Sequence, residues 1–206
     1  MENSREALEV EKNSKCQTWK REKYKKDKMV ELTKAALFTA AFCVLAPLTL
    51  YLPFSPVGIT LGSFLLYLTG LLLGPRLGCI SVFLYLCMGC IGLPVFAGYT
   101  AGAGVLFGPT GGFLIGYLPC VWVTGRIVKG SFGGKKGMVC FGVGMAVGTT
   151  ILYLFGTLWF MFVYAGGTSF GAAVMMCVFP FLPFDLIKII LAMVLYYPFL
   201  RLKLCV

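Results

Sequence analysis

Residues 59–92 read ITLGSFLLYLTGLLLGPRLGCISVFLYLCMGCIG, a stretch in which Arg76 is the single charged residue. Apolar runs of this kind, broken by short Gly/Pro segments, are typical of polytopic α-helical membrane proteins. The Gly-Pro pair at 74–75 interrupts the run, because proline lacks the amide hydrogen that a continuous helix needs. The stretch therefore predicts two consecutive membrane helices, 59–74 and 77–92.

The composition of the whole chain supports the same class. Of its 206 residues, 59% are hydrophobic and only 13% are charged, whereas a soluble domain of this size needs more polar residues to cover its surface. Several apolar segments are near the minimum length that spans a bilayer, which suits a compact bundle with re-entrant loops. The sequence thus predicts an all-α integral membrane protein with six transmembrane helices: 30–50, 59–74, 77–92, 110–128, 137–164 and 180–200.

The charged residues are concentrated at the amino-terminal end. Residues 1–34 hold ten of the eighteen Lys/Arg and seven of the eight acids. We therefore divide the chain into a charged tail, 1–29, and a transmembrane substrate-binding domain, 30–206. A plain solvated tail is the simpler interpretation, and contact with anionic lipid headgroups is the alternative. No cleaved signal peptide is expected, and no basic face continues into the body of the chain, so nucleic acid is not expected as a partner.

The remaining basic residues predict the orientation in the membrane. With a cytoplasmic amino terminus, every Lys or Arg of the connecting segments falls on the inner side, and the outer loops 51–58, 93–109 and 165–179 contain none. This bias predicts both termini in the cytoplasm, in a multi-pass protein of the cytoplasmic (inner) membrane. The inner residues concerned are Arg76, Arg126, Lys129, Lys135, Lys136, Arg201 and Lys203.

Two of the outer loops are rich in Pro, Gly and aromatic residues and carry no charge. Irregular backbone at membrane depth must be buried in protein or face a water-filled cavity, because lipid cannot satisfy its amides. We interpret the loops 51–58 and 93–109 as lids over a pocket that opens to the outside. Ordinary tight turns are the alternative interpretation.

The stretch PFLPFDLIK, residues 180–188, contains Asp185, the only carboxylate after Glu31. The two prolines predict that the last helix begins near Pro183 and that a short helix precedes it within 166–179. Asp185 then lies in the first turn, and Lys188 lies three residues later on the same face. Such a pair is either structural or marks a substrate route, with the carboxylate accepting N–H groups and the ammonium donating to oxygens.

Five motifs together resemble a known family: LPFSPVGITL, GLLLGPRLG, GLPVFAG, GPTGGFLIGY and PFLPFDLIK. In their order and spacing they are similar to the biotin-specific S components of energy-coupling-factor (ECF) transporters, the BioY family. The resemblance implies the six-helix ECF S-component fold and high-affinity capture of biotin at the outer side. It also implies two kinds of partner that supply energy, a transmembrane coupling subunit and cytoplasmic ABC-type ATPases.

The resemblance also assigns residues to the biotin site. Asp185 and Lys188 match the binding residues of the PFLPxDLxK signature; we expect Asp185 to accept a ureido N–H and Lys188 to donate to a biotin oxygen at either end. Thr60 is a further hydrogen-bonding candidate. The candidate pocket walls, for which core packing or a turn is the alternative, are Tyr85, Phe96, Gly98 and Tyr99.

This chain departs from the family at two of these motifs. Gly62 stands where members often have Gln, and Gly98 stands where many have Asn, so two polar side chains are missing from the expected pocket. On the first helix, Ala36 and Ala40 form a small-xxx-small pattern, which in this family contacts the coupling subunit.

Other classes of function find little support in the sequence. GGKKG at 133–137 lacks the spacing of a P-loop, and the chain has no histidine. Cys87 and Cys90 form a CxxC without a second pair, so we interpret them as apolar packing residues and expect neither a metal nor a cofactor. An enzyme is not expected. The alternatives kept open are an S component for another vitamin and a stand-alone proton-coupled vitamin transporter that uses Asp185 as the proton carrier.

Overall fold

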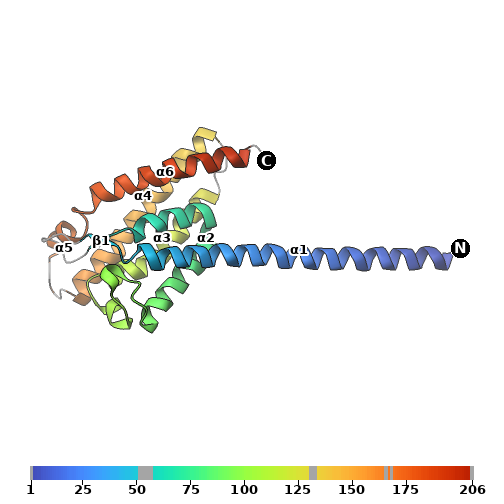
Figure 1. Ribbon diagram of the computed structural model, residues 1–206. Helices are drawn as coiled ribbons and strands as arrows, with labels where there is room; N and C mark the ends of the chain where they lie inside the picture. The colour runs from blue at the N-terminus through green and yellow to red at the C-terminus, as the bar shows by residue number, and fades with distance from the viewer. Residues whose placement is uncertain (1, 51–57, 130–133, 165–166, 168, 205–206) are drawn as a thin grey trace. The chain divides into compact units, whose positions relative to one another are not determined.

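The computed structural model describes residues 2–50, 58–129, 134–164, 167 and 169–204 (Figure 1). It divides into two compact units, Met1–Lys34 and Ala35–Val206. Helix α1 spans Glu2–Leu45, and all side chains from Gln17 to Lys34 are exposed.

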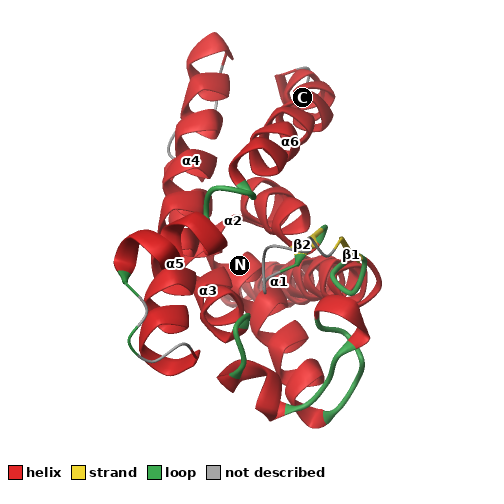
Figure 2. Ribbon diagram, turned by 90° about the vertical axis from the view of Figure 1, so that its left-hand side faces the viewer, coloured by secondary structure: helices red, strands yellow, loops and turns green. Residues whose placement is uncertain are grey.

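The described part of the unit 35–206 consists of helices and one pair of very short strands (Figure 2). Its α-helices after α1 are α2 (Gly62–Ile91), α3 (Gly111–Lys129), α4 (Gly134–Trp159), α5 (Phe170–Cys177) and α6 (Leu182–Leu204). The strands β1 (Thr49–Leu50) and β2 (Ile59–Thr60) pair antiparallel, with Thr49 opposite Thr60. Two 3₁₀ turns, η1 (Ala97–Tyr99) and η2 (Ala103–Phe107), lie between α2 and α3, and a π-helical turn, Phe160–Tyr164, continues α4.

The break predicted inside the first apolar stretch lies within α2. Gly74 leaves the helical conformation with φ 73° and ψ −172°, and Pro75 follows it. Glycine adopts a positive φ without a steric cost, whereas other residues do not. The two predicted helices 59–74 and 77–92 are therefore the two halves of one kinked element.

All six predicted helical segments are helical in the structure, with different ends. The first ends at Leu45 rather than at residue 50, since Pro47 follows and β1 begins at Thr49. The short helix expected within 166–179 is α5, and the last helix begins at Leu182, next to the predicted Pro183.

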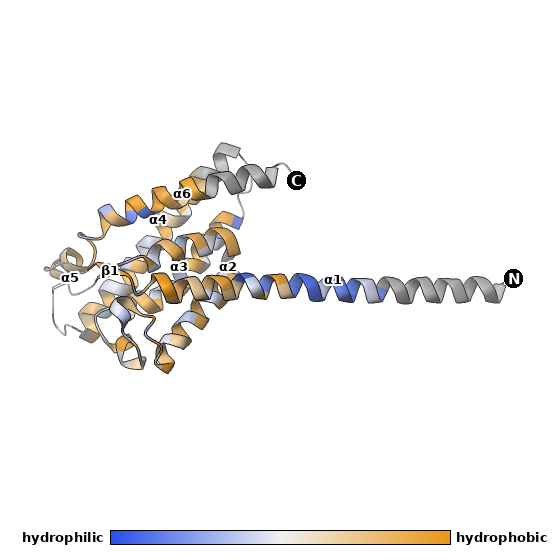
Figure 3. Cartoon of the chain, viewed as in Figure 1, coloured by the Kyte–Doolittle hydropathy of each residue, from blue (hydrophilic) through white to orange (hydrophobic). Residues whose placement is uncertain are grey.

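Hydropathy agrees with a membrane setting for the unit 35–206 (Figure 3). By length and composition, three described helical segments can cross a membrane: Gly62–Ile91, Gly111–Lys129 and Val139–Val163. Phe170–Cys177 and Leu182–Leu195 pass this test together as a pair bent by 47°. Such a bent pair is typical of a broken span or a re-entrant segment.

Close backbone contacts hold α2, α3 and α4 together, and the α2–α3 and α3–α4 pairs have the most extensive contacts. A Cβ at Gly78 would lie 2.7 Å from Val121 Cγ1, and one at Gly125 would lie 2.6 Å from the Pro75 nitrogen. Absence of a side chain at these two positions therefore lets α3 pack against both halves of the kinked helix.

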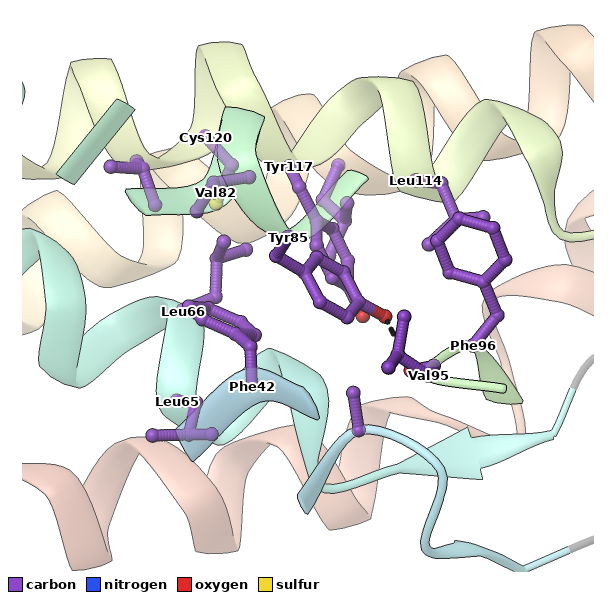
Figure 4. Close-up of a cluster of buried hydrophobic side chains, with 13 residues drawn as sticks. Phe42, Leu65, Leu66, Val82, Tyr85, Val95, Phe96, Leu114, Tyr117 and Cys120 are labelled. Atoms are coloured by element: carbon purple, nitrogen blue, oxygen red, sulfur yellow. Dashed lines mark hydrogen bonds between the residues drawn. The ribbon is translucent and has the colours of Figure 1, made fainter. Parts of the chain in front are cut away.

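The hydrophobic core beside these helices includes the end of α1 and the loop after α2. Phe42, Tyr85 and Phe96 are fully buried there, and the ring of Tyr85 contacts both of the other two rings (Figure 4). The loop 93–109 is tied down by its backbone, because the Gly102 amide donates to the Gly89 carbonyl at 2.8 Å. Of the other predicted lid, 51–58, all but Gly58 lies outside the described residues.

Candidate functional site

The carboxylate of Asp185 is buried at the start of α6, with 5% of the residue exposed. Its Oδ1 accepts from the Lys188 ammonium at 3.1 Å and from the Ser63 hydroxyl at 3.3 Å. Its Oδ2 accepts from the Tyr153 hydroxyl at 2.6 Å. Three helices, α2, α4 and α6, thus supply donors to one acid, and such hydrogen bonds offset the cost of burying a charge.

The ammonium of Lys188 is held by three protein acceptors. It donates to the Thr60 carbonyl oxygen at 2.8 Å, to Ser63 Oγ at 2.8 Å and to Asp185 Oδ1 at 3.1 Å. An ammonium has three N–H donors, so these contacts use all of them. Asp185 differs, because a carboxylate has about four acceptor positions and the described residues occupy three of them. The free acceptor position is on Oδ2.

These polar groups line a pocket whose roughly 610 Å³ of space free of protein atoms is partly open to solvent. The polar groups gather on one side, and the rest of the wall is mainly apolar and aromatic. The apolar and aromatic residues of this wall include Phe113, Leu114, Tyr117, Leu152, Tyr153 and Phe181.

Four of the residues predicted from the sequence line this pocket: Thr60, Tyr85, Asp185 and Lys188. The Tyr85 hydroxyl donates to the Val95 carbonyl at 3.2 Å, as the dashed line in Figure 4 marks, so its proton is already used within the protein. The Thr60 side chain is hydrogen-bonded to Tyr117, and its backbone carbonyl is an acceptor of Lys188.

The other three candidates lie outside the lining of this pocket. Phe96 is fully buried, packing edge-on against Tyr85 with ring centroids 5.7 Å apart, and its ring fills the space beside Gly89. Gly98 has a φ of 65°, and its amide donates to the Pro47 carbonyl and to Thr49 Oγ1. Tyr99 is 63% exposed. These three residues position the loop whose Ala97 does line the pocket.

The structure leaves little room for a side chain at Gly62. A Cβ at Gly62 would lie 2.9 Å from the Tyr117 hydroxyl and 3.3 Å from Thr60 Oγ1. The space beside Thr60 is therefore occupied by a hydroxyl that comes from α3.

Sequence reasoning missed Ser63 and Tyr153, the two hydroxyls that donate to Asp185. Ser63 lies only three residues after Thr60, at the start of α2, so its position close to Thr60 in the sequence could have indicated it. Tyr153 lies in the middle of an apolar helix, and no motif around it marks it. Among the described residues, no group of three or more Cys, His, Asp or Glu side chains could hold a metal ion.

Comparison with known proteins adds a family match. The model of the BioY family matches residues 17–203. A protein from Pyrococcus horikoshii described as a probable biotin transporter BioY is 32% identical, over 82% of this chain and 94% of its own length. The biotin transporter BioY of Thermotoga maritima is 36% identical, over 80% of this chain and 92% of its own length.

A solved structure has the same fold. It is the crystal structure of the S component for biotin from an ECF-type ABC transporter, with a TM-score of 0.77 and 29% sequence identity. The alignment covers 86% of this chain and 93% of the other. The six-helix architecture described above is therefore an S-component fold.

Proposed function

Because this chain belongs to the BioY family, we propose that it is the multi-pass membrane subunit that binds biotin for uptake. The observation that carries this proposal is the buried Asp185–Lys188 pair in the wall of a mainly apolar pocket. The family consists of transport subunits rather than enzymes, and biotin is a substrate here rather than a cofactor.

The chemistry of biotin matches the two halves of the pocket. Its ureido ring carries two N–H donors, and the acceptor position left on Asp185 Oδ2 suits one of them. Its thioether ring is apolar and suits the wall formed by Phe113, Leu152 and Phe181. The Thr60 and Tyr117 hydroxyls offer further hydrogen bonds to the ligand.

The same contacts favour one orientation of the ligand. The valerate carboxylate of biotin is repelled by the Asp185 carboxylate, and Lys188 has no N–H left for it (the three acceptors above use them all). We therefore assign the ureido ring to the Asp185 side and the valerate chain to the far side. Lys188 then acts mainly by fixing Asp185, and it contacts biotin only if one of its present bonds breaks.

The first prediction concerns ligand identity. In a panel of vitamins, only biotin should raise the thermal unfolding temperature of the purified protein, because its ureido N–H groups and its apolar thioether ring together match Asp185 and the apolar wall of this pocket. Mass spectrometry of the purified protein should also detect retained biotin. Stabilisation by a different vitamin, with none by biotin, would keep the fold assignment and reject the ligand.

The energy for uptake must come from partners. An S component of an ECF-type ABC transporter implies an ECF module, and we assign to it a transmembrane coupling subunit and cytoplasmic ABC-type ATPases. The orientation that places this module in the cytoplasm is supported by Figure 1. Within the unit 35–206, the end of α3, the start of α4 and the end of α6, where Lys and Arg concentrate, lie at one end, and α5 and β1 lie at the other. We accordingly propose the cytoplasmic membrane and two cytoplasmic termini.

The contact with the coupling subunit is assigned to the exposed face of α1. Ala36 and Ala40 are exposed, whereas Ala35, Thr39 and Phe42 on the other face are buried in the core. Two small side chains four residues apart allow another helix to approach closely.

The second prediction tests this face. Ala36→Leu should reduce co-purification of the coupling subunit by about tenfold, since a bulky side chain separates the two helices. Biotin binding should stay unchanged, because the position faces away from the pocket. Ala146→Leu, at an exposed alanine of α4, is the matched control and should assemble normally. Equal assembly of both variants would move the contact elsewhere.

A further inference from the structure

The amino-terminal segment has a charge pattern that biotin binding does not use. Residues 2–11 contain four acids and one arginine, whereas WKREKYKKDK at 19–28 contains six Lys/Arg and two acids. The negative charges are thus far along the chain from the first membrane segment, and the positive charges are close to it. We call residues 19–28 the basic segment.

The structure leaves the basic segment fully available for contact. Every side chain in it is exposed, including Trp19 and Tyr24, each 60% exposed. Lys23 Nζ lies 5.2 Å from the centre of the Trp19 ring, and Lys28 Nζ lies 4.7 Å from that of Tyr24. A hydrogen bond to Tyr24 raises the pKa of Lys28. A helix that is polar on all sides has no face committed to its own core.

We propose that the basic segment docks on the anionic phospholipid headgroups of the membrane that the rest of the chain spans. Six cations within ten residues, just before a membrane helix, match the polybasic pattern that such headgroups attract. Trp and Tyr are the aromatic residues that favour the headgroup region. The four acids of residues 2–11 would be repelled by the same anionic surface. Their distance along the chain from the basic segment avoids this repulsion.

The test uses the full chain in nanodiscs, with hydrogen exchange of the amides of residues 17–34 as the readout. Exchange should be about tenfold slower in phosphatidylcholine discs that contain phosphatidylglycerol than in pure phosphatidylcholine discs. High salt should abolish the difference, because it screens surface charges. Inorganic phosphate added to the neutral discs should give no protection. Equal exchange in the two kinds of disc, or equal protection by free phosphate, would overturn the proposal.

Two variants make the result specific to the cations. The first replaces the six basic residues by glutamine, at Lys20, Arg21, Lys23, Lys25, Lys26 and Lys28, and it should lose the dependence on phosphatidylglycerol. The second replaces the distal acids by glutamine, at Glu2, Glu6, Glu9 and Glu11, and it should keep that dependence. Both should bind biotin like the unmodified protein, which separates this proposal from the transport function. Lipid dependence that persists in the first variant would refute a role for these cations.

Discussion

Asp185→Asn is expected to weaken biotin binding about 100-fold, or roughly 3 kcal/mol, because a charge-assisted hydrogen bond to the ligand is lost. The amide keeps the shape of the carboxylate. Its oxygen can still accept from Lys188, and Tyr153 can turn its hydroxyl to accept from the new NH₂ group. However, that NH₂ group presents a donor where the ureido N–H needs an acceptor. Isothermal titration of the detergent-solubilised protein measures the loss.

A second, milder variant shows whether the loss of biotin affinity comes from the carboxylate itself. Tyr153→Phe removes only the hydroxyl that donates to Asp185 Oδ2 at 2.6 Å. It should weaken binding by about tenfold, since one hydrogen bond to a charged group is missing and the charge remains. Unchanged affinity in the Asp185 variant, with normal affinity in the Tyr153 variant, would assign the pair a purely structural role.

The placement of the charged pair could be predicted because the sequence features that determine it lie within a few residues of the pair. Two prolines fix where α6 begins, and a spacing of three residues puts Asp185 and Lys188 on one helix face. The kink at Gly74 was equally local, because a Gly-Pro pair within an apolar run leaves few other conformations.

The remainder of the site depends on contacts between distant parts of the chain. Ser63 lies 122 residues before its acceptor Asp185, and Tyr153 lies 32 residues before it. Nothing in the neighbourhood of Tyr153 distinguishes it from the other nine tyrosines. In the loop 93–109, the sequence alone could not predict which aromatic side chains are buried, since short irregular turns have no periodicity. The structure buries Phe96 and exposes Tyr99. The β1–β2 pair was missed for the same reason, because two-residue strands show no alternation.

Lys188→Met should lower the thermal unfolding temperature by roughly 5–10 °C, because it leaves an unpaired buried carboxylate, a defect worth about 3 kcal/mol. Methionine fills most of the space of the lysine stem, so the change is mainly electrostatic. The substitution also strips the Thr60 carbonyl and Ser63 Oγ of their donor, which loosens the link between the start of α2 and α6. Thermal unfolding without biotin measures this effect apart from ligand binding.

The double variant Asp185→Asn with Lys188→Met distinguishes a structural from a binding role. It removes both charges, so the unfolding temperature should recover most of what Lys188→Met loses, since a neutral pair has no uncompensated charge. Biotin binding should stay as weak as in the Asp185 variant alone, because the acceptor for the ureido N–H is still missing. If the double variant instead recovered tight binding, the ligand would need neither charge, and the apolar wall alone would have to account for its recognition. If it stayed as unstable as Lys188→Met, the loss of the Thr60 and Ser63 contacts, rather than the unpaired carboxylate, would be the cause.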